Sequence, residues 1–282
     1  MSKTLHTVMS NDNVTPYRVS TITCNGSVSS RIDLTELYNY LDIINNDNDK
    51  GFIFIMDRNG EMVKGVNPRK KKISKKDENK SYRRFDNAIS TYFKLTEGYN
   101  PSVKIFKNGT IQMTGVKKIK DGEELHKNVF NIINKLYDKN PKMFENKPQF
   151  DEEKFYVRMI NSDFSVPYLI RRKELHKIII SHTYQNSCSF QPGTYPGVKL
   201  QYFWNPVIGE KNGICKCTEE KCFGKGDGNG HGKCKKVTVS IFESGKILIT
   251  GATNFEQIDE AYNYICRFMK DNVASIKKTS HI

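Results

Sequence analysis

One short sequence pattern occurs twice in this chain, and it constrains the fold more than any other feature. The first copy is Ile105–Val116 (IFKNGTIQMTGV) and the second is Ile241–Ala252 (IFESGKILITGA). In both copies β-branched and other apolar residues occur at every second position on either side of an Asn-Gly or Ser-Gly pair. This pattern is typical of two antiparallel strands joined by a tight turn. Each copy therefore predicts a β-hairpin.

A helical pattern follows each hairpin in the same register. After the first hairpin, Asp121 and Glu124 have the spacing of a capping box, and after the second Asn254 and Gln257 take these places. Apolar residues then recur at helical spacing in both halves. Since a strand and a short helix also precede each hairpin, with Asp33 as the expected cap of the first short helix, the sequence predicts an α+β fold with pseudo-twofold symmetry.

The repeat and the composition together divide the chain into segments. We expect a disordered tail at 1–15, a first repeat at 16–137 and a linker at 138–154. A second repeat at 155–272 and a second tail at 273–282 follow. The first repeat contains an insertion at about 45–84, which comprises a hairpin with a primed turn at Asn59-Gly60 and a run of Lys and Arg. The second repeat contains a Cys-rich insertion at about 205–236.

The composition limits the classes of partner. The net charge of +14 favours a polyanion such as nucleic acid, although an organism with a Lys-rich proteome would give the same excess. No apolar run approaches the ~20 residues that a membrane-spanning helix needs, and the polar start of the chain lacks the apolar segment of a secretory signal. The seven cysteines, an odd number, indicate reduced thiols or metal ligands in an intracellular protein that is not secreted.

Strand alternation places one Phe of each hairpin on the side away from the long helix. Val103 and Ile105 share the face that the helix would cover, as Val239 and Ile241 do in the second half. The opposite face carries Lys104, Phe106, Gln112 and Thr114 in one half and Ser240, Phe242, Leu248 and Thr250 in the other. An uncovered face with a repeated aromatic residue suits a binding surface, and the alternative is that another element packs on it.

At these residues the sequence resembles the TATA-box-binding protein family. The family signature is Ile-Phe, a small residue, a Ser-Gly-Lys turn, alternating apolar residues and Thr-Gly-Ala, which Ile241–Ala252 matches almost letter for letter and the first copy more loosely. Tyr195–Gly197 resembles the family's Phe-Pro-Gly, and Arg31–Leu34 its Arg-Leu-Asp-Leu. The resemblance spans roughly 17–137 and 155–270 apart from the insertions, and the composition is similar to TATA-binding-like proteins of large DNA viruses.

The resemblance implies a saddle, in which the concave face of a curved antiparallel sheet lies on the DNA minor groove and two long helices lie on the convex face. The family is itself a standard example of apolar side chains that wedge between base steps and kink the duplex. By matched position the wedges are Phe106, Phe242, Tyr195 and Phe85, the last preferred to Phe93.

The resemblance also implies which other residues face DNA. Besides the wedges, this set contains Thr114, Thr250, Val19, Asn161, Lys104, Gln112 and Leu248. Tyr17 and Met159 take the places of the family's base-reading asparagines, with Asn161 as a substitute. Lys104, Gln112 and Ser240 stand where the family has aliphatic residues, which argues against a strict TATA preference. Because minor-groove readout mostly separates A·T from G·C pairs, we expect an AT-rich site.

The cysteines of the second insertion form a separate candidate site. Cys215, Cys217, Cys222 and Cys234 supply four soft ligands, enough for a tetrahedral structural Zn²⁺ ion, and His231 is an alternative ligand. The other interpretation is four free thiols in a loop rich in Gly and Lys. Zinc is favoured because a loop of this length would otherwise lack a core to order it.

The expected function is a general transcription initiation factor, not an enzyme, that binds and bends double-stranded promoter DNA. Its partners would be other general transcription factors and RNA polymerase, with no membrane and no small-molecule substrate. It would act in the nucleus or at a cytoplasmic viral replication site, or be packaged in a virion. The alternatives are an accessory to a nucleic-acid enzyme and an interaction module that no longer binds DNA. No His-Glu-X-X-His, phosphate-binding Gly loop or Ser/His/Asp pattern favours catalysis.

Overall fold

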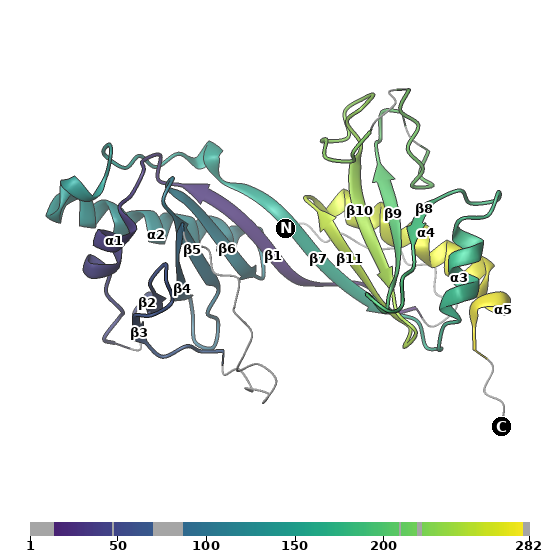
Figure 1. The fold of residues 1–282 in the computed structure, drawn as a ribbon, viewed down its shortest axis with the longest axis horizontal. Helices are drawn as coiled ribbons and strands as arrows, with labels where there is room; N and C mark the ends of the chain where they lie inside the picture. The colour runs from purple at the N-terminus through teal and green to yellow at the C-terminus, as the bar shows by residue number, and fades with distance from the viewer. Residues whose placement is uncertain (1–13, 47, 70–86, 209, 219–221, 279–282) are drawn as a thin grey trace, which may run out of the picture. The chain divides into compact units, whose positions relative to one another are not determined.

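The chain forms two units that follow the same plan (Figure 1). A computed structural model describes residues 14–46, 48–69, 87–208, 210–218 and 222–278. The first unit is Thr21–Arg158, and the second unit contains the described part of Met1–Ser20 together with Met159–Ile282. The division between the units falls inside the first strand of each repeat, so each unit contains a few residues from the other half of the sequence.

The first unit is an antiparallel sheet with the order β3-β2-β4-β5-β6-β1. Its helix α2 packs on one face against β6 (Figure 1). Alternate residues of the two neighbouring strands are fully buried, Val103 and Ile105 in β5 and Ile111 and Met113 in β6. Its elements are β1 (Arg18–Ser27), α1 (Leu34–Tyr40), β2 (Gly51–Met56), β3 (Val63–Gly65), β4 (Ala88–Lys94), β5 (Ser102–Phe106), β6 (Thr110–Val116), α2 (Ile119–Lys139) and the 3₁₀ turns Pro141–Met143 and Glu152–Lys154.

The second unit repeats this arrangement with the order β7-β11-β10-β9-β8. Helix α4 packs on β10 and β11 over Val239, Ile241, Ile247 and Ile249, which are fully buried (Figure 1). Its elements are β7 (Tyr156–Ser165), α3 (Arg172–Ile179), β8 (Ser187–Ser189), β9 (Val198–Trp204), β10 (Lys235–Ile241), β11 (Lys246–Ala252), α4 (Phe255–Asp271) and α5 (Val273–Ile276). The predicted α+β class, with antiparallel strands and one long helix for each repeat, is confirmed.

The two repeated hairpins dock their turns in the same way. The carbonyl of Gly109 accepts a hydrogen bond from the amide of Val28 (3.0 Å), and that of Gly245 accepts one from the amide of Val166 (3.0 Å). Both glycines have φ +83°, and an added Cβ would lie 2.2 Å from the Ser30 carbonyl oxygen at Gly109 and 2.5 Å from the Val166 carbonyl oxygen at Gly245. A glycine is therefore required at both turns.

The three predicted helix caps differ in outcome. Asn254 caps α4, since its side chain accepts a hydrogen bond from the amide of Gln257 (3.0 Å). The prediction for Asp121 was wrong, because α2 begins earlier at Ile119 and Lys118 occupies the cap position without a side-chain hydrogen bond. Asp33 caps α1 as expected.

The hairpin of the first insertion is present. One of its two strands has an equivalent in the second unit, and the other does not. β2 pairs with β4, so it occupies the position that β8 has in the other sheet, and β3 alone is additional. The predicted primed turn is wrong, because Asn59 does not have the positive φ that such a turn requires. Instead the Asp57 side chain accepts hydrogen bonds from the amides of Glu61 and Met62.

The segments expected to be linker and tails are partly structured. α2 continues to Lys139, and Phe144 beyond it is buried and forms a β-bridge with Ile32. Near the C-terminus, Lys277 forms a β-bridge with Ile170. Residues 1–13 and 279–282 lie outside the described part of the chain. Among the helices that are described, none combines the length and apolar character that crossing a bilayer demands.

Candidate nucleic-acid interface and cysteine cluster

In each unit the face opposite the long helix carries the side chains expected to contact DNA. Lys104, Phe106, Gln112 and Thr114 are half-buried on this open face of the first unit, between neighbours that are fully buried on the other side. In the second unit Phe242, Leu248 and Thr250 are half-buried, while Ser240 is buried at 5% exposure. Partial burial lowers the pKa of Lys104. We call these two surfaces the open faces.

Two of the four predicted wedges lie side by side in the second unit. The rings of Tyr195 and Phe242 have their centroids 5.8 Å apart, and the Lys199 ammonium lies 3.9 Å from the Tyr195 ring centroid. An added Cβ at Gly197 would lie 2.8 Å from the Tyr195 ring and 3.2 Å from the Phe242 ring. Gly197 therefore leaves the space in which the two rings sit together. Phe85, the fourth predicted wedge, lies outside the described residues, as does the basic run beyond Arg69.

An arginine holds the turn and the Tyr195 loop together. Arg172 donates hydrogen bonds to the Glu243 carboxylate (2.8 Å) and to the Pro196 carbonyl oxygen. Lys278 also donates to Glu243 and, together with Arg172, lowers the pKa of its carboxyl group. The Arg172 side chain therefore joins the two segments that carry the Tyr195 and Phe242 rings.

The structure corrects the positions assigned to the family's asparagines. The Tyr17 hydroxyl donates a 2.6 Å hydrogen bond to Asp259, and the Tyr17 ring packs edge-on against Tyr262, so Tyr17 is held against α4. The strand register also shows that Tyr17 and Met159 do not occupy equivalent positions in the two repeats. Ile22 pairs with Val116 in the first unit as Ile160 pairs with Ala252 in the second. Counting from these pairs, Tyr17 corresponds to Phe155, and Met159 corresponds to Thr21.

The other predicted residues of β1 and β7 are half-buried. Val19 belongs to this group, and so does Asn161. The Oδ1 atom of Asn161 is buried and has no hydrogen-bond partner among the described residues. The carboxamide of Asn161 therefore keeps an unused acceptor.

Sequence reasoning missed a charged group on the open face of the second unit. Asp163 is opposite Leu248 in the sheet and is 8% exposed. Its carboxylate accepts hydrogen bonds from Arg18 Nε at 3.2 and 3.1 Å and lies 3.7 Å from Lys246 Nζ. Strand alternation was a sufficient signal, because Asp163 lies two residues beyond Asn161. The family resemblance assigned DNA contacts only to the positions named above, and Asp163 is not among them.

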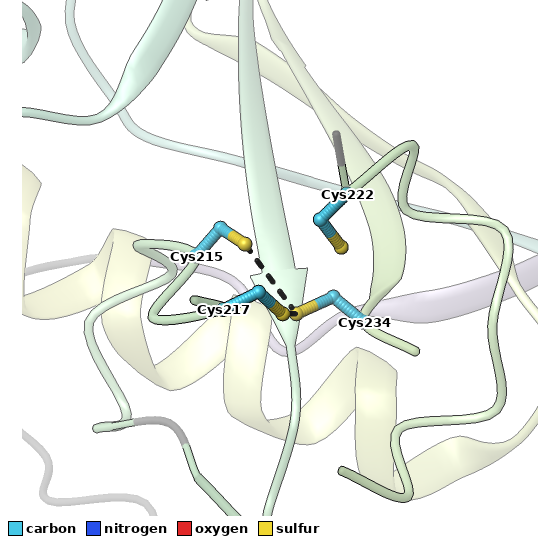
Figure 2. A group of neighbouring side chains, drawn as sticks. All are labelled: Cys215, Cys217, Cys222 and Cys234. Atoms are coloured by element: carbon cyan, nitrogen blue, oxygen red, sulfur yellow. Dashed lines mark hydrogen bonds between the residues drawn. The ribbon is translucent and has the colours of Figure 1, made fainter. Parts of the chain in front are cut away.

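The four cysteines expected to bind a metal are brought together (Figure 2). Cys215, Cys217, Cys222 and Cys234 have sulfur atoms that all lie within 4.8 Å of one another. Cys234 is the innermost, with sulfur distances of 3.7 Å to Cys215 and 3.4 Å to Cys217. The four cysteines can therefore hold a metal ion.

The surroundings of the cluster act on its thiols in opposite directions. The Gly232 amide lies 3.2 Å from Cys217 Sγ, and Asn205 Nδ2 lies 3.5 Å from Cys234 Sγ, so these two sulfur atoms each have an N–H donor beside them. Burial raises the pKa of the Cys215 and Cys234 thiols. Burial also raises the pKa of Cys222, but hydrogen bonds with the backbone of Gly224 and Cys234 and with the side chains of Cys217 and Cys234 together outweigh it and lower the value to about 7.

The loop that carries the cluster has more packing than the sequence suggested. An added Cβ at Gly213 would lie 2.5 Å from the Tyr202 ring, and one at Gly228 would lie 2.2 Å from the Trp204 ring. The loop therefore packs closely on β9, so the premise that it would otherwise lack a core to order it is wrong. His231 is not part of the metal-binding group, because its Nδ1 lies 3.3 Å from both the amide and the hydroxyl of Thr218.

Comparisons with known proteins agree with the doubled motif. The family model described as transcription factor TFIID (or TATA-binding protein, TBP) matches residues 229–272. The TATA-box-binding protein-like protein of Acanthamoeba polyphaga mimivirus is 28% identical over 217 residues, which cover 70% of this chain and 51% of that protein. The chain thus spans about half the length of this curated relative. The TBP of Methanococcus jannaschii superposes with a TM-score of 0.49 at 13% identity, covering 91% of this chain and 99% of that one. In its doubled hairpin motif, in residues 229–272 and over 70% of its length, the chain is thus similar to TATA-box-binding protein-like proteins.

Proposed function

We propose that this chain is a transcription initiation factor, without catalytic activity, that binds the minor groove of promoter DNA and bends it. The observation that carries the proposal is the repeated phenylalanine. Phe106 and Phe242 occupy the same place in the two repeats, on faces that the long helices leave open. An apolar ring that enters a base step unstacks it, and the bent duplex then contacts more protein surface. The net charge of +14 favours the same partner.

The test is DNA bending measured by energy transfer between dyes at the two ends of a short duplex. We expect the full chain to bend AT-rich duplexes more than GC-rich ones, because the minor groove distinguishes these classes. Phe106→Ala and Phe242→Ala should each reduce the bend. Phe255→Ala is the matched control, since Phe255 is exposed at the start of α4 and lies on neither open face. Binding without bending, or bending that persists in both variants, would contradict the proposed wedges.

A second candidate function is a protein-interaction module that keeps the fold without binding DNA. Its support is the polar character of the open faces, where Lys104 and Gln112 lie in the first unit and Asp163 lies in the second. No binding to any duplex at low salt would favour this candidate over the first.

We also propose that the cluster of Cys215, Cys217, Cys222 and Cys234 holds a structural Zn²⁺ ion. Four thiolates close the coordination shell of the metal, and a closed shell leaves no position for a substrate. Purified protein should contain about one zinc per chain by mass spectrometry, as a single four-ligand site implies. Cys217→Ser should lower this content, whereas Cys188→Ser should not, because Cys188 lies outside the cluster. Zinc-free protein with native loop packing would contradict the site.

The partners beyond DNA follow from the family relationship alone. We propose general transcription factors and RNA polymerase as these partners, with recruitment to bent promoter DNA as the activity. In a reconstituted transcription reaction, addition of the chain should raise promoter-directed initiation, and the Phe242→Ala variant should do so less. The place of action, whether nucleus, cytoplasmic replication site or virion, stays a prediction.

A further inference from the structure

The first insertion carries an arginine onto the open face of the first unit. Tyr92 lies four residues along β4 from Ala88, the partner of Phe106, so strand alternation places Tyr92 on this face. The guanidinium carbon of Arg69 lies 5.4 Å from the centroid of the Tyr92 ring. On β6, an added Cβ at Gly115 would lie 3.3 Å from Arg69 Nη2. Arg69 therefore lies over the open face, against both β4 and β6.

The strand that leads to Arg69 is anchored on helix α1. The ammonium group of Lys64 in β3 lies at the C-terminal end of this helix, where it donates hydrogen bonds to the carbonyl oxygens of Tyr38 (2.8 Å), Asn39 (3.1 Å) and Leu41 (2.8 Å). The last carbonyl groups of a helix have no partner inside it, and a cation there is also favourable for the helix dipole. Three hydrogen bonds from one side chain therefore fix β3 against the first unit.

The segment between β3 and Arg69 has a defined backbone. Gly65 has φ +77°, and an added Cβ there would lie 2.2 Å from the Ile53 carbonyl oxygen, so glycine is required at this turn. Further along, the Asn67 side chain accepts a hydrogen bond from the Arg69 amide (2.9 Å). The strand β3, which has no counterpart in the second unit, thus holds Arg69 over the open face.

The guanidinium of Arg69 has no counter-charge in the described part of the chain. Arg69 is exposed and forms no ion pair with an acidic group there. Stacking on an aromatic ring uses the flat face of a guanidinium and leaves the N–H donors at its edge, where their fork matches two oxygen atoms of a phosphate. Arg69 therefore presents a positive charge and oriented donors on a surface that we propose to meet DNA.

The Tyr92 ring that supports Arg69 lies away from the predicted wedge of the same unit. Four strand residues separate Tyr92 from the partner of Phe106, which corresponds to about 14 Å along the strand. The minor groove is only about 6 Å wide, and phosphates line both of its edges. At this distance from the wedge, a phosphate is a more accessible acceptor than the base step that the Phe106 ring would enter.

We propose that Arg69 binds a backbone phosphate of the DNA duplex and that Tyr92 is its positioning residue. The proposal rests on the proposed function, because it needs the open face of the first unit to lie on DNA. A phosphate carries no base identity, so this contact adds affinity for any sequence and fixes the position of the protein on the duplex. The first insertion is thereby a DNA-binding element in addition to the two repeated hairpins.

The salt dependence of binding to one AT-rich duplex tests the contact. Arg69→Gln should reduce the slope of log affinity against log salt concentration by about 1, as the loss of one phosphate contact implies. A fourfold rise in salt should then weaken binding of the unmodified chain about 3.5 times more than binding of this variant. Arg267→Gln is the matched control, since Arg267 is exposed on α4, which covers the other face of its sheet, and this variant should keep the slope.

Two further arms identify the groups involved. Replacement of one phosphate at a time by a neutral methylphosphonate should reveal a position that weakens binding of the unmodified chain and leaves Arg69→Gln unchanged. Arg69→Lys should keep the slope but bind more weakly, because an ammonium keeps the charge without the fork of donors. Tyr92→Leu should weaken binding of the unmodified chain but not of the Arg69→Gln variant, a dependence that a merely structural role of Tyr92 would not produce.

The outcomes separate this proposal from the function on which it rests. An unchanged slope in Arg69→Gln, or an equal reduction in Arg267→Gln, would overturn the proposal while DNA bending by the unmodified chain persists. So would a methylphosphonate scan in which every position affects the unmodified chain and Arg69→Gln alike. If Arg69→Gln does not fold, the same scan with Arg69→Lys decides, and equal losses at every position would overturn the proposal. Absence of binding to every duplex would instead overturn the proposed function, and this proposal with it.

Discussion

At the scale of single residues, the turn glycines carry the strictest requirement in the repeated hairpins. Gly109→Ala and Gly245→Ala should each destabilise the chain by about 1–2 kcal/mol from left-handed backbone strain, with a further loss from the close carbonyl oxygens. Gly193→Ala is the control, because nothing lies within 4 Å of its added Cβ and its φ is not positive. Urea unfolding measures all three. Equal stabilities for the three variants would contradict the requirement.

His126 predicts how stability depends on pH. The ring is 1% exposed, presses on Gly26, and places Nε2 3.2 Å from the Ser27 amide nitrogen and 3.1 Å from its carbonyl oxygen. Burial lowers the pKa of His126, and the hydrogen bond with the Ser27 carbonyl raises it by less.

The folded state disfavours the charged imidazole. The contribution of His126 to the free energy of unfolding is therefore complete above the ordinary histidine pKa of about 6.5, and it is lost as the pH falls toward the lower pKa of the folded state. Urea unfolding at pH 7.5 and pH 5.5 should show this loss, and His126→Gln should reduce it. An NMR titration that places the His126 pKa above its ordinary value would contradict the sign.

At the scale of elements, the two long helices begin differently and allow a matched comparison. Asn254 caps α4 through its side chain, whereas Lys118 occupies the same position in α2 without a side-chain hydrogen bond. Asn254→Ala should therefore cost about 1 kcal/mol of unfolding free energy, and Lys118→Ala should cost little. Thermal and urea unfolding measure the difference. A similar loss in both variants would mean that the Asn254 side chain contributes nothing as a cap.

The elements themselves were largely predictable, because their signals are local. Alternation around Asn108-Gly109 and Ser244-Gly245 and the helical stripes that follow are properties of neighbouring residues, and both hairpins and both long helices are present. The position of β2 was not predictable in this way. Its place beside β4 depends on pairing between distant segments, and β8 at the matching edge is only three residues long, so no repeat in the sequence revealed it.

The site was predictable only in part for the same reason. Strand alternation placed Phe106 and Phe242 correctly on the open faces, since the faces follow from period two. The orientation of the Tyr17 side chain could not be predicted from the sequence, because it depends on a hydrogen bond to Asp259, 242 residues further along the chain. The cysteines converge as their spacing indicated, while the packing of their loop on Trp204 required the fold.

At the scale of the whole molecule, residues 155–158 are expected to complete the first unit. Phe155 lies on α2, where an added Cβ at Gly122 would be 3.1 Å from its ring, and Tyr156 accepts the hydrogen bond from Asn25. A chain ending at Arg158 should therefore be more stable than one ending at Asp151, by about 1–3 kcal/mol for the apolar surface of Phe155.

Circular dichroism melting of the two truncated chains checks this expectation. The matched control is the chain ending at Arg158 with Phe155→Ala, which should lose most of the difference. Identical melting of the two truncated chains would show that residues 155–158 contribute nothing to the first unit.

The exchange of strand ends between the units has a consequence for proteolysis. The stretch from Lys147 to Asp151 separates α2 from β7, yet a cut there leaves Tyr156–Arg158 attached to the C-terminal fragment although they belong to the first unit. The N-terminal fragment likewise keeps Arg18–Ser20, which belong to the second unit. Each fragment thus holds a piece that the other needs, and a nicked chain should elute as a single noncovalent complex.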